Sequence, residues 1–169
     1  MKTLAIGNET EQVCYAYFEG ENLIEYGKLQ TEHLDVLYET ISAFAKDKGL
    51  SYIVVHGVDF ENTKRRTALK LIRIRTIIKL ICEQLGIVYA TPSVHGWEKY
   101  LFGDRIQCKK LALEKIEIVN RVYNIVTPGL QYDSNDYQRN DLGVADAIVM
   151  GSAFTTNRYK KSVEGYYGL

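Results

Sequence analysis

The alternation of apolar and polar residues predicts three short strands at the start of the chain. An apolar run over 3–6 ends at Gly7-Asn8, and two further strand patterns cover 12–18 and 22–29. Glu19-Gly20-Glu21 lies between the last two, and glycine adopts the positive φ of a tight hairpin without strain. We therefore expect three consecutive antiparallel strands.

The period becomes helical after residue 31. Apolar residues spaced by three and four predict a helix over 32–48, ending at Gly49: Leu34, Leu37, Ile41, Phe44 and Ala45. The segment 52–58 is rich in β-branched residues and is typical of a parallel strand covered on both faces. A long helix is predicted over 62–85, with a core stripe of Leu71, Ile74, Ile78, Ile81 and Leu85. Ala68, Leu69 and Ile72 lie outside that stripe and could contact a partner subunit.

Strand and helix patterns also alternate in the second half of the chain. The pattern predicts a short buried strand over 87–90, a short helix over 93–102 that carries Trp97, and a surface loop over 127–140. A helix over 109–123 would bury Leu111, Leu113, Ile116, Val119 and Val122. A closing helix over 142–154 would be capped by Asn140 or Asp141. We expect one α/β domain over 1–156 and a tyrosine-rich tail, 157–169, that becomes ordered on contact with another chain.

The net charge of zero conceals two oppositely charged segments. Residues 1–61 hold four Lys or Arg and eleven Asp or Glu, whereas residues 62–125 hold thirteen and five. Such a division favours a basic surface for a polyanion, although a solvated helix surface explains it as well. No apolar stretch is long enough to span a membrane, so we expect a cytoplasmic protein with reduced thiols at Cys14, Cys82 and Cys108.

Four segments together resemble one known family. They are LAIGNETEQVCYAYFEGENLIEYGKL, YIVVHGVDF, SVHGWEKYLFG and GVADAIVMGSAF, in this order between residues 3 and 154. They are similar to the phage-type RuvC Holliday junction resolvases. The resemblance implies a ribonuclease H-like fold with a mixed five-stranded sheet, a phage or mobile-element origin and a role in DNA recombination. It also implies two divalent metal ions, held by four carboxylates, that cut DNA.

The resemblance places three of the four metal ligands on residues that are not acids. The positions fall on Gly7 after the first strand, His56 on the central strand, and Gly143 and Asp146 in the last helix. Mg²⁺ prefers oxygen ligands, and two cations about 4 Å apart need several negative charges. One carboxylate and one imidazole do not supply these charges, so we predict the fold without the cleavage activity.

Nearby acids leave an alternative open. Glu9, Asp59 and Asp141 each lie within three residues of an expected ligand and, with Asp146 and His56, could rebuild a displaced metal site. Each acid also has an ordinary interpretation: Glu9 is a turn residue, Asp59 a loop residue and Asp141 a helix N-cap. The ordinary interpretation of His56 is a core histidine. Mg²⁺ or Mn²⁺ would be a cofactor only if the site were rebuilt, and otherwise we expect none.

The leading hypothesis is a catalytically inactive RuvC-like protein that binds branched DNA or a partner protein, as a homodimer through the helix over 62–85. Candidate nucleic-acid contacts are the basic residues Lys64, Arg65, Arg66, Lys70, Arg73, Arg75, Lys109 and Lys110. An active junction endonuclease with a relocated metal site is the first alternative. The second is a protein-interaction or regulatory module that does not bind nucleic acid.

Overall fold

The computed structural model describes residues 1–7, 12–30, 33–57, 63–92, 97, 112–126 and 129–156. Its centre is a five-stranded sheet in the order β3-β2-β1-β4-β5. The strands are β1 (Lys2–Ile6), β2 (Gln12–Glu19), β3 (Asn22–Gln30), β4 (Tyr52–Val55) and β5 (Val88–Ala90). The pairs β1–β2 and β2–β3 are antiparallel, and β1–β4 and β4–β5 are parallel. The predicted mixed sheet is confirmed.

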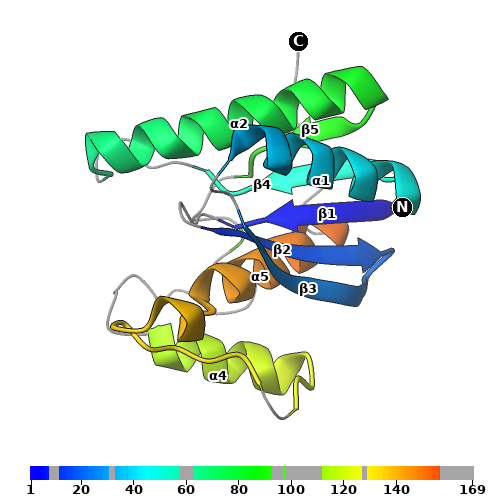
Figure 1. Ribbon diagram of the computed structural model, residues 1–169. Coiled ribbons are helices and arrows are strands. Elements are labelled where there is room, and N and C mark those ends of the chain that lie inside the picture. The colour runs from blue at the N-terminus through cyan, green and yellow to red at the C-terminus, as the bar shows by residue number, and fades with distance from the viewer. Residues whose placement is uncertain are drawn as a thin grey trace.

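Helices cover both faces of the sheet, as Figure 1 shows. On one face lie α1 (Leu34–Lys48) and α2 (Arg65–Leu85), and on the other lies α5 (Leu142–Thr155), with α4 (Ala112–Val122) packed beyond it. The strand residues divide between the two faces by their alternation. Leu4 and Ile6 of β1 join the apolar cluster under α1 and α2, whereas Ala5 joins the cluster under α5.

The central helix α5 is buried on nearly all sides. Every residue from Gly143 to Thr155 is buried except Asp146. Its approach to the sheet is very close, because a Cβ added at Gly151 would lie 2.3 Å from Phe18 Cε2 and 2.9 Å from Ala5 Cβ. A helix packed this tightly on the sheet is fixed in place, and so is the site at its first turn.

The structure differs from the sequence pattern at the edges of the domain. The strand predicted over 52–58 ends at Val55, and Val88 of the strand predicted as buried is 52% exposed, because β5 forms an edge of the sheet. In α4, Leu113 and Val122 are exposed while Ala112 is buried, so the predicted stripe was wrong there. The face of α4 that α5 covers is narrow, and these two residues flank it.

Some predictions lie outside the described residues. These are the helix over 93–102, apart from the helical and fully buried Trp97, together with Cys108 and the tail over 157–169. Cys14 and Cys82 are buried thiols. Of the helices that the structure describes, none is long and apolar enough to cross a membrane.

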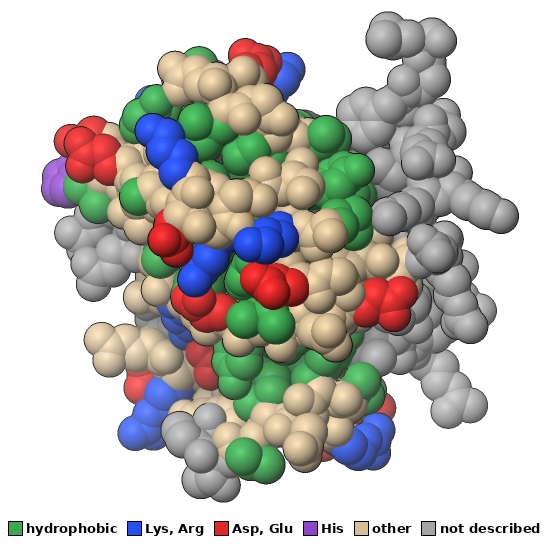
Figure 2. All heavy atoms as spheres, turned by 90° about the vertical axis from the view of Figure 1, so that its right-hand side faces the viewer, with side chains coloured by type: hydrophobic (Ala, Val, Ile, Leu, Met, Phe, Trp, Pro, Cys, Tyr) green, Lys and Arg blue, Asp and Glu red, His purple; other side chains and the backbone are tan. Residues whose placement is uncertain are grey.

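The described part of the face in Figure 2 carries acidic and basic side chains side by side, without a patch of one sign.

Candidate functional site

Two of the positions that the resemblance assigns to metal ligands, Gly7 and His56, lie next to each other at the ends of adjacent parallel strands. Ile6 pairs with Val55, and the His56 backbone N–H donates to the Ile6 carbonyl oxygen at 3.0 Å. Ala5 and Val54 face α5, and successive residues of a strand alternate between the two faces of a sheet. Gly7 and His56, two positions further along the chain, therefore lie on the α5 side of the sheet as well.

The first turn of α5 meets the end of β1 at this point. Gly143 lies against Gly7, and Asp146 follows one helical turn later on the same helix. The fold therefore brings the four positions to one region, at the carboxyl ends of the parallel strands. Of the four acids that the resemblance implies at these positions, only Asp146 is present.

Gly7 is required by the close approach of α5. A Cβ at Gly7 would lie 2.3 Å from the Gly143 carbonyl oxygen, 3.1 Å from the Gly143 carbonyl carbon and 3.4 Å from Cys14 Cβ. The φ of Gly7 is outside the positive range that demands glycine, so the space alone excludes a side chain. An aspartate at this position would overlap the backbone of the helix that carries the other two positions.

His56 is packed as a core residue. It is 8% exposed, and its ring lies edge-on to Trp97 with centroids 5.1 Å apart. Its Nδ1 is 2.6 Å from the Gly57 carbonyl oxygen, and Arg75 Nη2 donates to the His56 carbonyl oxygen. Burial lowers the pKa of the Arg75 guanidinium. Arg75 therefore holds the end of β4 and is not a surface cation.

Both described acids near the site lie beside lysines. Asp146 Oδ1 is 3.9 Å from Lys115 Nζ of α4. Asp141 Oδ1 is 2.7 Å from Lys28 Nζ of β3, and its Oδ2 accepts the backbone N–H of Gln131 at 2.7 Å.

The same contacts decide how α5 is capped. Asp141 occupies the N-cap position but makes no capping hydrogen bond with its side chain. Instead, Asn140 Oδ1 accepts the N–H of Leu142, at 3.2 Å. The Asp141 side chain thus forms an ion pair with Lys28, and the Asn140 side chain caps the start of α5.

These residues do not fit a pair of divalent cations. The helix backbone fills the space of the first ligand, His56 packs on Trp97, and Asp146 faces an ammonium group. Within the described ranges, no three His, Cys, Asp or Glu side chains form a group that could hold a metal ion. Glu9 and Asp59, and the predicted contacts Lys109 and Lys110, lie outside the residues that the structure describes.

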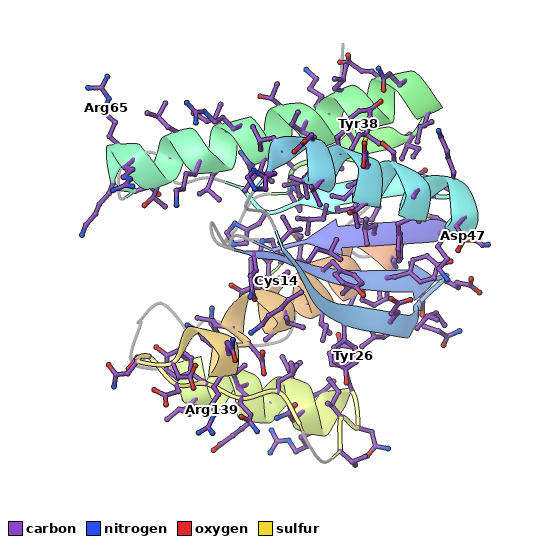
Figure 3. The ribbon with its side chains drawn as sticks, in the orientation of Figure 1. Cys14, Tyr26, Tyr38, Asp47, Arg65 and Arg139 are labelled. Atoms are coloured by element: carbon purple, nitrogen blue, oxygen red, sulfur yellow. The ribbon has the colours of Figure 1, made fainter. Side chains whose placement is uncertain are left out.

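The basic residues of α2 do not form one continuous strip. At about 100° per residue, Arg66, Lys70 and Arg73 share one side of the helix, and Arg75 lies on another. Lys64, Arg65, Arg66 and Arg73 are exposed, and Lys70 is half-buried. Arg65 extends away from the body of the domain at the start of α2 (Figure 3).

An apolar strip occupies the outermost line of α2, between these cations. Leu69, Ile72 and Leu80 are 49%, 40% and 42% exposed, and the exposed Thr76 continues the same line. Large apolar side chains aligned in this way on a helix are typical of a contact with another chain.

The sheet order, the mixed strand directions and the central α5 define the RuvC-like form of the ribonuclease H-like fold, as the sequence predicted. Solved structures with this fold include Thermus thermophilus RuvC, with a TM-score of 0.69 and 12% identity over 96% of each chain. Thermus thermophilus RuvC in complex with a Holliday junction gives 0.68 and 10%, again over 96% of each chain. The yeast mitochondrial Holliday junction resolvase gives 0.59 and 10%, over 97% of this chain and 80% of that one. No family model matches the chain, and no curated protein sequence does.

The sequence pattern did not indicate the roles of Lys28, Lys115 and Trp97. Lys115 and Lys28 lie on predicted elements, where a lysine usually faces solvent, and nothing local marks them as partners of distant acids. Trp97 could have been suspected, because the single tryptophan of a chain is often buried.

Proposed function

We propose that this chain is a catalytically inactive RuvC-like protein that binds branched DNA. The approach of α5 to β1 supports the loss of cleavage, because the carbonyl oxygen of Gly143 occupies the space where the first catalytic carboxylate would begin. The similarity to RuvC in complex with a Holliday junction supports junction DNA as the ligand. The exposed cations of α2 supply groups that bind phosphates without reading the base sequence.

Fluorescence anisotropy with a labelled four-way junction and a linear duplex tests the DNA ligand. We expect preferential binding to the junction that weakens as the salt concentration rises, because bound cations release counterions from the phosphates. Replacing Arg66, Lys70 and Arg73 together with alanine should reduce the slope of log K against log salt by up to about 3. Lys46→Ala, an exposed cation on α1, is the matched control and should leave the slope unchanged.

Absence of binding, or binding that salt does not weaken, would eliminate nucleic acid as the ligand. The apolar strip of α2 would then carry the function as a protein-binding surface, which is the second candidate. In the first candidate, the strips of two copies meet in a homodimer and are not open to another protein. Leu69→Glu places a charge in that contact and should convert a dimer to a monomer in sedimentation equilibrium.

The relocated nuclease is the remaining alternative. Its metal ligands would come from Glu9, His56, Asp59, Asp141 and Asp146, and lysines lie beside the last two. Incubation of the four-way junction with Mg²⁺ or Mn²⁺ should give no cleavage. Cleavage that Asp146→Asn abolishes would replace the proposed function with the enzymatic one.

A further inference from the structure

Asp146 is a mostly buried carboxylate that needs a cation nearby. Its side chain is 16% exposed, and the side chain of Lys115, whose Nζ lies 3.9 Å from Oδ1, is 13% exposed. Removing a carboxylate from water is unfavourable unless a positive charge or hydrogen bonds compensate it. Lys115 therefore supplies a positive charge where solvent contributes little.

Lys115 reaches Asp146 from a different helix, at the edge of the contact between α4 and α5. Its neighbour Ile116, together with Val119, is buried in the apolar cluster that includes α5. The ion pair and the apolar contact thus form together when α4 packs on α5. In Figure 1, α4 lies on the far side of α5 from the sheet, so α5 is its route of attachment to the strands.

We propose that Lys115 is the resident counter-ion of Asp146, taking the electrostatic role that a divalent cation would have there. As a positioning residue it fixes α4 against α5, and it keeps Mg²⁺ and Mn²⁺ away from the carboxylate. A divalent cation bound to Oδ1 would stand close to the ammonium group, where like charges repel strongly. This inference concerns Asp146 alone and does not depend on DNA binding.

Manganese binding, measured by electron paramagnetic resonance without nucleic acid, tests the exclusion. Wild type should show no Mn²⁺ binding that depends on Asp146. Lys115→Met keeps an unbranched apolar stem but removes the ammonium group, so it should gain a weak site that Asp146→Asn removes again. Lys115→Arg keeps the charge and should resemble wild type. Binding to wild type that Asp146→Asn abolishes, or no gained site in folded Lys115→Met, would overturn the proposal.

A double-mutant cycle in urea, with chelator present, tests the positioning role. Lys115→Met should lower the folding equilibrium constant by roughly tenfold or more, because it removes the ammonium group 3.9 Å from a mostly buried carboxylate. Asp146→Asn in the same protein should recover much of that loss, and it should restore folding if Lys115→Met alone is unfolded.

The pair Lys2–Glu19 is the matched control. Its separation is 3.8 Å, but its side chains are 44% and 49% exposed, so its coupling should be close to nil. Coupling between Lys115 and Asp146 no larger than that of the control pair would also overturn the proposal.

Discussion

Placing a side chain on Gly7 is the sharpest test of how the site is closed. A Cβ there would lie 2.3 Å from the Gly143 carbonyl oxygen, whereas ordinary contacts begin at 3.4 Å, so α5 or β1 must move by about 1 Å. Both elements are buried, and overpacking of this kind costs about 1 to 3 kcal/mol. The lower entropy of the unfolded alanine variant offsets up to about 1 kcal/mol. Gly7→Ala should therefore lose about 1 to 2 kcal/mol of stability, roughly a five- to thirtyfold fall in the folding constant.

Urea unfolding followed by circular dichroism and by tryptophan fluorescence measures this loss. The control is Gly27→Ala on β3, where the added Cβ would meet the Tyr15 ring at 3.3 Å, a side chain that can shift by a few tenths of an ångström. We expect this control to be within about 1 kcal/mol of wild type. Gly7→Asp should lose at least as much stability as Gly7→Ala and should still not cleave a four-way junction. Wild-type stability of Gly7→Ala, or cleavage by Gly7→Asp, would refute the closed site.

Three further results are expected. Lys28→Met should cost about 2 to 3 kcal/mol in urea unfolding, because it leaves the carboxylate of Asp141, 20% exposed, without its ammonium partner; a change below about 0.5 kcal/mol would contradict this. Tyr15, half-buried and hydrogen-bonded to Glu25, has its pKa raised from 10.0 to about 12. The folded state thus binds the Tyr15 proton more tightly than the unfolded state does. The stabilisation that this group contributes is complete below pH 10 and is lost as the pH rises through about 12. Tyr15→Phe should flatten the fall of stability in that range, and an unchanged profile would argue against the shift. Gly151→Ala should destabilise by about 1 to 3 kcal/mol, because its Cβ would lie 2.3 Å from a ring carbon of β2; thermal unfolding equal to wild type would show that the helix can move.

The order and type of the elements could be predicted because hydrophobic periodicity is a local property. The core stripe of α2 is buried at Leu71, Ile74, Ile78 and Ile81, as the three- and four-residue spacing predicted. The pattern was wrong for Leu113 and Val122 because periodicity shows which residues share a side but not how wide a side its neighbour covers. Homodimer formation, cytoplasmic location and a phage or mobile-element origin stay predictions.

The candidate site could be predicted only in part. The resemblance identified Gly7, His56, Gly143 and Asp146, and the structure places them in one region, at the ends of β1 and β4 and the start of α5. The basic residues of α2 were treated as one set, but Arg75 is committed to the His56 carbonyl. The helical period predicts that Arg75 lies on a different side of α2 from the other cations. It does not predict the hydrogen bond of Arg75 to the end of β4.

The sequence by itself determined the fold class, the mixed sheet and the absence of acids at three positions where the resemblance implies metal ligands, because each of these follows from residue type and spacing. Only the tertiary structure decided that the helix backbone closes the space at Gly7, and that Lys115 and Lys28 lie beside Asp146 and Asp141. These contacts join residues far apart in the chain. They depend on how closely α5 approaches β1 and on the packing of α4, which follow from the volumes of buried side chains throughout the core.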